Sequence, residues 1–260
     1  MDLSNKNILI TGASSGIGYQ LAKDLVKQGA NLALLARRKN IIDNLAEESK
    51  SFPSKIITAF CNVTSKESVK EAFDFVKKEF ENIDIAILNS GASYRMKVED
   101  FNSDHIEEIF NVNLIGMIYC LNELIPDFIK NKNGCIVGNS SLSEVRGFPG
   151  SAAYASSKAA VSTFLESIRI ELKKYNVKVI TIKPGFIKTP MTDKNEFHMP
   201  FLMEVEKASQ IILKGIKKEK DIIQFPLPTV LGAKFLRIIP DKLFNYFFSL
   251  TLPAKKYSSK

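Results

Sequence analysis

Tyr154 and Lys158 lie four residues apart in segment 151–160, a spacing that places a phenol and an ammonium on one face of a helix. At about 4 Å and an effective dielectric of about 20, the two groups would interact by roughly 4 kcal/mol. Such an interaction would lower the phenol pKa by about 3 units, so that the tyrosine exchanges a proton near working pH. Because this spacing is common on helix surfaces, the pair indicates catalysis only together with other features.

A glycine-rich segment near the N-terminus supplies the first of those features. The apolar residues 7–10 predict a buried strand, and the sequence Thr11-Gly-Ala-Ser-Ser-Gly-Ile-Gly18 follows and leads into a helical pattern. Gly12 permits a tight turn, Gly16 lets the backbone approach a pyrophosphate, and Gly18 allows close helix packing. The free N–H groups at the helix start can bind an anion. The segment therefore predicts a phosphate-binding turn.

These two motifs, in this order, resemble those of the short-chain dehydrogenase/reductase family, and the similarity covers about residues 5–225. Four further motifs agree in order and spacing. They are Leu88-Asn-Ser-Gly91 for the family's Asn-Asn-Ala-Gly, Asn111-Val-Asn113 for its Asn-x-Asn, Ser140-Ser141 for its serine pair, and Pro184-Gly185 with Thr189 for its Pro-Gly segment. The resemblance implies hydride transfer between a nicotinamide and a carbonyl or alcohol carbon.

The resemblance also implies catalytic roles for Asn113, Ser141, Tyr154 and Lys158. In the reductive direction Tyr154 would donate a proton to the developing alkoxide, and Ser141 would hydrogen-bond the same oxygen. Lys158 would lower the phenol pKa and hold the nicotinamide ribose. Asn113 would interrupt a helix and hold a water on a proton path, whereas Ser140 would point elsewhere.

The cofactor contacts that the resemblance implies are spread along the chain. They are Gly12, Ser14, Ser15, Gly16, Ile17, Gly18, Arg37, Arg38, Asn62, Val63, Asn89, Gly91, Tyr154, Lys158, Pro184, Gly185, Ile187 and Thr189. The Ile187 backbone and Thr189 would hold the carboxamide. Leu88, Ser90 and Asn62 depart from the family pattern along the adenine-ribose wall. The Asn62 amide oxygen can still accept from the adenine amino group, although Asn62 can equally be an ordinary turn residue.

Cofactor choice is indicated by Ala36-Arg37-Arg38, at the end of the second predicted strand. A carboxylate at this point would bind the ribose 2′-hydroxyl of NAD. A guanidinium can instead bind a 2′-phosphate through charge-assisted hydrogen bonds. We therefore expect NADP(H), with the preference resting mainly on Arg37 because Ser15 is neutral where some relatives carry a second basic residue. The alternative is a solvated basic surface.

Hydrophobic periodicity predicts alternating strands and helices. Strands are expected at residues 7–11, 31–36, 55–60, 84–88, 134–139, 177–183 and 221–225, and helices at 17–28, 40–50, 66–81, 104–131, 152–174 and 202–218. This alternation predicts an α/β fold with one doubly wound, parallel, Rossmann-like sheet and helices on both faces. The 260 residues and 45% hydrophobic content suit a single domain over 1–260, with residues 226–260 as an apolar and basic extension of it.

Composition argues against several other function classes. Cys61, Cys120 and Cys135 lack metal-ligand spacing, and the chain has only two histidines, so neither a metal site nor a Ser-His-Asp hydrolase is expected. The odd cysteine number suits a reducing compartment, and the strand and glycine turn begin too early for a signal peptide, so a cytoplasmic location is expected. The net charge of +8 is spread over helices without a nucleic-acid motif, so no nucleic-acid partner is expected.

Residues 192–203 are expected to cover the substrate, and Phe197, Met199, Phe201 and Met203 indicate an apolar pocket for a lipophilic carbonyl or alcohol. The alternative is ordinary packing over the nucleotide. A nucleotide-sugar epimerase or dehydratase would share the Tyr-Lys pair, but no large C-terminal substrate domain is visible. A regulator that senses NADP(H) without turnover is the alternative among binding proteins, and the intact catalytic residues disfavour it.

The family resemblance also implies that the chain forms a homodimer or homotetramer. Family members pair through two long helices, which here correspond to those expected at residues 104–131 and 152–174. The apolar stripe of Val161, Phe164, Leu165 and Ile168 would either form that contact or pack on the sheet.

The C-terminal extension consists of apolar pieces divided by prolines and charges, each too short to cross a bilayer. Its apolar residues are Leu231, Phe235, Ile238, Leu243, Phe244, Phe247 and Phe248, and its basic residues are Lys234, Arg237, Lys242, Lys255 and Lys256. We favour an interpretation in which the apolar residues cap the substrate pocket or form an oligomer contact. The alternative is peripheral contact of residues 226–256 with an anionic membrane surface that holds lipophilic substrates.

Overall fold

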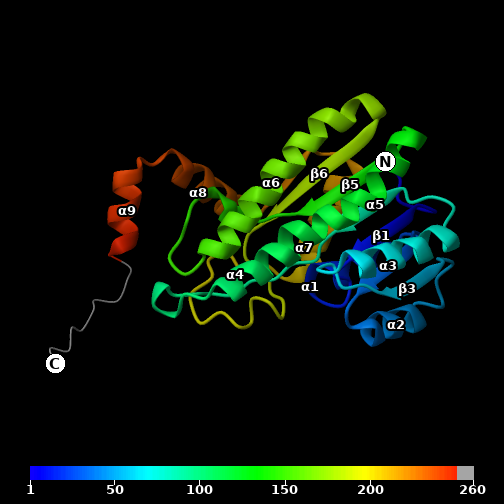
Figure 1. Cartoon of the computed structure of the whole chain (residues 1–260), viewed down its shortest axis with the longest axis horizontal. Coiled ribbons are helices and arrows are strands. Elements are labelled where there is room, and N and C mark those ends of the chain that lie inside the picture. Colours follow the sequence, from blue (N-terminus) through cyan, green and yellow to red (C-terminus); the bar gives the residue numbers. More distant parts are fainter. Residues whose placement is uncertain (251–260) are drawn as a thin grey trace.

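The computed structural model describes residues 1–250 and shows one parallel sheet between two layers of helices (Figure 1). Its strands are β1 (Asn7–Thr11), β2 (Asn31–Ala36), β3 (Ile56–Phe60), β4 (Ile85–Leu88), β5 (Gly134–Asn139), β6 (Val177–Pro184) and β7 (Ile222–Phe225). They lie in the order β3-β2-β1-β4-β5-β6-β7, and every neighbouring pair is parallel. The predicted α/β class with a doubly wound parallel sheet is confirmed. Lys255 and Lys256 lie outside the described residues.

Each face of the sheet carries its own hydrophobic core, which is why the strands read as nearly continuous apolar runs. One core includes residues of α1 (Gly16–Val26), α2 (Lys39–Glu48) and α7 (Val205–Lys217). The other includes residues of α3 (Lys66–Glu79), α5 (Gly116–Asn131) and α6 (Ala152–Leu172). The strand order reverses between β1 and β4, and in such sheets ligands bind beyond the carboxyl ends of the strands at this point.

The helix expected at 104–131 is interrupted. It consists of α4 (Ser103–Phe110), a π-helical turn (Asn111–Ile115) and α5. The run Ser103–Asn131 is long and apolar enough by length and composition to cross a membrane. However, α5 buries Cys120, Leu124 and other apolar residues against the sheet, so its hydropathy is that of a core helix.

Two helices follow β7 that the sequence pattern did not predict. They are α8 (Leu227–Ile238) and α9 (Asp241–Ser249), and α9 lies at the far end of the molecule from the N-terminal half of the sheet (Figure 1). The prolines that divide this segment stand at helix starts, where proline is favourable: Pro226 and Pro240 precede the first helical residues, and Pro228 is the second residue of α8.

Candidate active site

The glycine-rich turn between β1 and α1 has the backbone that its sequence predicts. Gly12 and Gly16 have φ of +67° and +56°, a region that other residues rarely adopt. A Cβ on Gly12 would lie 2.9 Å from the Ser90 Cα, and one on Gly18 would lie 2.6 Å from the Gly12 carbonyl oxygen. The first turn of α1 therefore begins at a tight backbone contact, with its N–H groups directed toward the carboxyl edge of the sheet.

A cleft of about 340 Å³ lies at this edge, and most of the residues predicted to hold a cofactor line it. They are Gly12, Ser14, Ser15, Gly16, Ile17, Arg37, Arg38, Asn62, Val63, Asn89, Gly91, Tyr154, Lys158 and Thr189. Gly18, Pro184, Gly185 and Ile187 are not among the lining residues. The lining also contains Ala36, Cys61, Ser90, Val112, Asn139, Pro190 and Met191, which the sequence analysis did not assign. All of these except Asn139 and Met191 adjoin an assigned residue, so the motifs marked the right segments.

Charge in the cleft has one sign. Arg37, Arg38 and Lys158 are the ionised groups that line it, and no carboxylate does. Arg38 also lies across the glycine turn, where its guanidinium donates to the Ser14 Oγ at 3.1 Å and to the Ser15 Oγ at 2.8 Å. The sequence pattern favoured Arg37 for the cationic role, and it carried no sign of this link between β2 and the turn. A dinucleotide with its phosphates fits this lining of cations, hydroxyls and a helix N-terminus.

Asn62 is a turn residue in this structure, and its expected contact with the adenine stays a prediction. Its Oδ1 accepts from the Thr64 backbone N–H at 3.3 Å and from the Thr64 hydroxyl at 3.0 Å, as a turn residue does. Asn62 also lines the cleft. The two bonds from Thr64 occupy both lone pairs of the amide oxygen, so the expected acceptance from the adenine amino group would require one of them to be given up.

Tyr154 and Lys158 extend from one face of α6, and the Lys158 ammonium lies 5.9 Å from the centre of the Tyr154 ring. Lys158 is buried and donates to the Asn139 carbonyl oxygen at 2.8 Å. Ser141 precedes the short 3-10 helix η3 (Leu142–Val145), and its Oγ accepts from the Ser143 backbone N–H at 3.1 Å. The predicted phenol and ammonium thus both line the cleft, and the Ser141 hydroxyl, which does not line it, lies within hydrogen-bond reach of the phenol.

The predicted lowering of the Tyr154 pKa by Lys158 is wrong for this structure. Burial raises the pKa of the Tyr154 phenol, and a hydrogen bond with Ser141 acts in the opposite direction with a smaller effect. Burial also lowers the pKa of the Lys158 ammonium to about 8. The sequence spacing placed the two groups on one face but carried no information about how far each would be removed from water.

Asn113 lies in the π-helical turn that interrupts the α4–α5 run, and it is fully buried. Its Oδ1 accepts from the Ala92 backbone N–H at 2.8 Å, and its Nδ2 donates to the Ala92 carbonyl at 3.0 Å and to the Ser157 Oγ at 2.9 Å. A Cβ on Gly91 would lie 3.3 Å from the Asn113 Oδ1 and 3.6 Å from the Lys158 Nζ. Asn113 therefore anchors the loop after β4 to α6 beside Lys158.

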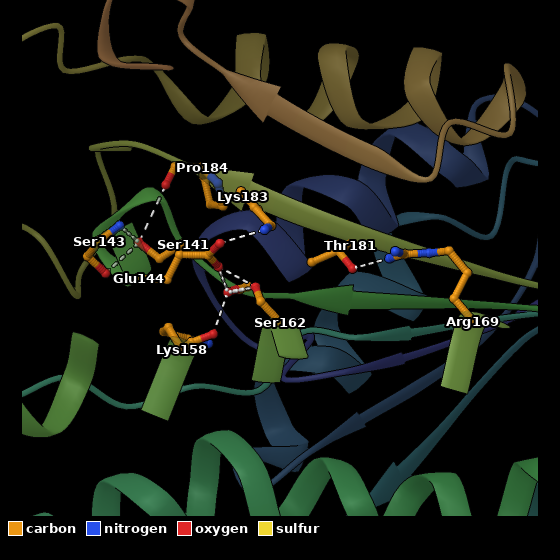
Figure 2. Close-up of polar contacts among 10 residues, drawn as sticks. Ser141, Ser143, Glu144, Lys158, Ser162, Arg169, Thr181, Lys183 and Pro184 are labelled. Atoms are coloured by element: carbon orange, nitrogen blue, oxygen red, sulfur yellow. Dashed lines mark hydrogen bonds and ion pairs between the residues drawn. The ribbon is translucent and has the colours of Figure 1, made fainter. Parts of the chain in front are cut away.

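A buried polar network lies directly behind Ser141 and Lys158 (Figure 2). The Ser140 hydroxyl donates toward the Glu144 Oε2 at 2.8 Å and the Lys158 carbonyl oxygen at 2.9 Å. Glu144 also accepts from Ser162 and forms an ion pair with Lys183 at 2.5 Å, in which both side chains are about 15% exposed. The network joins the Ser140–Ser141 segment, α6 and the end of β6, and the motifs gave no signal for Glu144 or Lys183.

The segment expected to cover the substrate contributes less apolar lining than predicted. The Phe197 ring contacts Phe186 at 5.8 Å between centroids and lies under the Arg95 guanidinium. Met203 instead pairs with Ile187 and packs against the core, and Phe201 is 59% exposed. Ordinary packing thus accounts for part of this stretch, because its ends are held to β6 and to the core.

The apolar stripe on α6 is likewise partly core. Val161 and Leu165 are fully buried against the sheet, so they are unavailable for subunit pairing, and Phe164 and Ile168 are partly buried. Cys61, Cys120 and Cys135 are buried free thiols, and burial raises the pKa of Cys61 to about 11. Within residues 1–250, no group of three or more His, Cys, Asp and Glu could hold a metal ion.

The fold and the cleft together define an α/β oxidoreductase that binds a nicotinamide dinucleotide. Residues 6–199 match the family model described as short chain dehydrogenase, and the chain belongs to this family. It is 32% identical over 244 residues to an uncharacterized oxidoreductase of Myxococcus xanthus, covering 94% of this chain and 96% of the relative.

Two solved structures share the fold. A short-chain dehydrogenase/reductase of Burkholderia phymatum in complex with NAD has a TM-score of 0.83 at 17% identity and full coverage of both chains. A short-chain dehydrogenase of Sphingobium yanoikuyae in complex with NADPH has a TM-score of 0.80 at 23% identity, covering 98% of each chain. The family resemblance predicted from the motifs is confirmed. One of these structures holds NAD and the other NADPH, so they do not distinguish between the two cofactors for this chain.

Proposed function

We propose that this protein is an NADP(H)-dependent oxidoreductase that interconverts a lipophilic carbonyl compound and its alcohol, with Tyr154 as the general acid and base. One observation carries the proposal. The cleft is lined by two arginines at the end of β2 and by Tyr154 and Lys158 of α6, with Ser141 within hydrogen-bond reach of Tyr154, and no carboxylate lines it. The nicotinamide, when bound, would supply or accept the hydride.

The residues around the reacting carbonyl would supply the proton and the orientation. In reduction, Tyr154 donates its phenolic proton to the oxygen that becomes the alcohol, and Ser141 holds that oxygen by a hydrogen bond. The Ser141 bond favours the phenolate, which partly offsets the effect of burial on the phenol pKa. Lys158 holds the ribose hydroxyls. Asn113 fixes the loop beside Lys158 so that both keep their positions.

The NADP(H) preference is supported by Arg37 and Arg38. A ribose 2′-phosphate at the end of β2 would meet two guanidinium groups and the hydroxyls of Ser14 and Ser15, whereas an NAD-binding carboxylate is lacking from the lining. Fluorescence titration of the protein should show NADPH binding at least about tenfold tighter than NADH. Arg37→Ala and Arg38→Ala should each reduce that ratio about 10- to 100-fold, and Lys39→Ala, at the neighbouring surface, serves as control. Equal affinities for the two cofactors in the unchanged protein would contradict the preference.

The catalytic part is tested by Tyr154→Phe, which removes only the phenolic hydroxyl. With a panel of apolar ketones and aldehydes, turnover should fall by at least about 100-fold, the effect expected from a positioned general acid. NADPH affinity should stay within about threefold of the parent, because α6 and Lys158 are unchanged. Retained turnover would assign the proton to another group. If the parent protein binds NADPH but turns over nothing in a broad panel, the sensing regulator becomes the better description.

A lipophilic substrate is supported by Met191 in the lining of the cleft, by the contact of Phe186 with Phe197 in the segment that follows β6, and by the aromatic packing of α9 on the loop before α6. A cytoplasmic location is part of the same proposal, since NADPH-dependent reduction and three free thiols both suit a reducing compartment.

A further inference from the structure

α8 presents an apolar stripe to solvent. Leu227, Leu231, Phe235 and Ile238 recur at spacings of four, four and three residues, which places them on one face of the helix. They are 68%, 57%, 62% and 76% exposed. Four large apolar side chains on one short helix form the kind of contiguous patch that marks an interaction surface.

A lysine-rich cavity adjoins this stripe. It has a volume of about 620 Å³, lies between α7, β7 and α8, and is lined by Lys214, Lys218, Lys220 and Lys234 over an apolar floor that includes Ile223 and Val230. No carboxylate lines the cavity, and none of the four ammonium groups forms an ion pair with the described residues. Leu227 belongs to both the stripe and the cavity wall, and Lys234 stands beside the stripe, so the two features form one continuous face.

The neighbouring acidic groups do not neutralise this face. Glu219 is directed to Lys178, with 3.4 Å between Oε2 and Nζ, and to the N-terminal amine. Asp221 is not among the residues that line the cavity. α8 itself contains Lys234 and Arg237 and no acidic residue. The partner that complements the face must therefore combine apolar surface with negative charge.

We propose that α8 and the lysine-rich cavity form a docking face for the surface of an anionic phospholipid membrane. The apolar stripe would enter the boundary between headgroups and acyl chains, and the lysines would lie among the phosphates. Each lysine near such a surface strengthens binding about fivefold. With 12 residues, α8 is far shorter than the roughly 20 needed to span the bilayer, so the contact is peripheral.

A second copy of the chain fits this face less well. A two-fold interface brings the same patch of each subunit together, so the four lysines of one cavity would face or flank the four of the other. Without a carboxylate in the lining, that arrangement places like charges in a partly desolvated contact. An anionic lipid surface complements both parts of the face, because its acyl chains can contact the apolar stripe and its phosphates can pair with the lysines.

One end of the docking face lies near the segment that follows β6. A Cβ on Gly185 would lie 3.1 Å from the Pro226 Cδ and 3.3 Å from the Thr229 Cγ2, so the start of α8 packs against the segment that follows β6. Docking would bring the segment after β6, which leads to Thr189 in the cleft, toward the bilayer, where lipophilic carbonyl compounds are concentrated. This last consequence rests on the proposed function, whereas the docking itself does not.

Vesicle co-sedimentation of the full chain tests the docking directly. The protein should bind vesicles of phosphatidylcholine with about 30% phosphatidylglycerol at low salt, bind pure phosphatidylcholine at least about tenfold more weakly, and dissociate at about 0.5 M salt. No binding to the anionic vesicles at low salt, or equal binding to both compositions, would overturn the proposal. Because the measurement needs neither cofactor nor turnover, its failure is distinguishable from failure of the proposed function.

Matched variants locate the contact. Lys218→Gln with Lys220→Gln should weaken vesicle binding about 30-fold, and Leu231→Ser with Phe235→Ser at least about tenfold. Lys173→Gln with Lys174→Gln changes two exposed lysines at the end of α6 and should leave binding within about threefold. Because all six positions are exposed, unfolding midpoints and NADPH affinity should be unchanged.

Equal losses of vesicle binding in the Lys173 and Lys174 control would show that the binding depends on net charge alone, and would overturn the docking face. A dimer by light scattering that the α8 variants dissociate would instead assign the face to subunit pairing.

Discussion

Lys158 carries its charge in a place where burial disfavours it. Its pKa is lowered to about 8 from the ordinary 10.5, and its described hydrogen-bond partner is the neutral Asn139 carbonyl oxygen. The unfolded chain therefore binds more protons than the folded chain between these two values, so the stability contributed by this site rises as the pH increases from about 8 to 10.5. Below pH 8 the buried charge has its full cost, roughly 3 kcal/mol.

Replacing Lys158 by an uncharged residue should increase the stability of the fold and decrease the activity. Lys158→Met should raise the free energy of unfolding at pH 7 by about 1–3 kcal/mol, with the lost bond to Asn139 reducing the gain, and the difference should shrink toward pH 10.5. Turnover and NADPH affinity should both fall. Denaturant unfolding at pH 7 and at about pH 10 measures the first effect. A variant that is less stable than the parent at pH 7 would show that Lys158 stabilises the fold rather than straining it.

Glu144 is expected to act through Ser141 and Lys158, because it holds Ser140 and the end of β6 behind them (Figure 2). Glu144→Gln leaves the Lys183 ammonium buried without a charged partner and should cost about 3–5 kcal/mol of stability. Adding Lys183→Met removes that unpaired charge and should restore most of the loss.

The double variant separates positioning from stability. If the network positions the catalytic groups, Glu144→Gln with Lys183→Met should regain its unfolding midpoint yet keep a kcat about tenfold below the parent, with NADPH affinity unchanged. If the restabilised variant has the same kcat as the parent, the network has only a structural role.

The sequence identified most of the groups that line the cleft, but among the groups that support them it identified only Asn113. Tyr154, Lys158, Ser141 and Asn113 stand in motifs with fixed spacing, and the structure brings them together. Glu144 reaches the same place from a short 3-10 helix by a contact with β6 that has no periodic signature. The direction of the Tyr154 pKa was also not predictable, because burial depends on packing by distant segments.

At the scale of elements, the strand and helix pattern was readable because buried parallel strands are short apolar runs separated by amphipathic helices. The predicted boundaries agree to within about three residues, as helix ends commonly do. Periodicity alone did not show the π-helical turn at Asn111–Ile115, but the family resemblance predicted that Asn113 would interrupt this helix, and that prediction is confirmed: Asn113 lies in the turn and bonds to the backbone of Ala92. It also could not show α8 and α9, since their prolines were interpreted as breaks rather than as helix starts.

α9 closes over the loop that connects Ser141 with Tyr154. The Phe148 ring contacts Phe244 and Phe248 at 5.9 and 5.3 Å between centroids, and the Arg146 guanidinium lies over Phe244. This inner face supports the interpretation in which the extension caps the pocket. Because α9 is attached to the body mainly through this contact, its removal should loosen the loop without unfolding the sheet.

Phe244→Ala should therefore raise KM for apolar substrates about tenfold or more, since burial of a phenylalanine is worth about 1.5–3 kcal/mol. NADPH affinity should be unchanged, because no residue of α9 lines the cofactor cleft. Phe247→Ala is the matched control: the same residue type on the same helix, but 57% exposed on the outer face. If both variants raise KM equally, the effect comes from a general change in the α9 helix and not from the contact between Phe244 and Phe148.

At the scale of the whole molecule, subunit pairing remains a prediction, and the structure narrows where it can occur. Val161 and Leu165 belong to the core, so pairing through α6 must use the partly buried Phe164 and Ile168 and the exposed Ile170, which is 74% accessible. We expect light scattering at micromolar concentration to give at least twice the mass of one chain. Phe164→Glu should shift that mass to the monomer, because a carboxylate in a desolvated symmetric contact would face its own copy. Lys132→Glu, at an exposed position after α5, makes the control change of charge. A parent protein that is monomeric at this concentration would exclude pairing, and a dimer that Phe164→Glu leaves intact would move the interface away from α6.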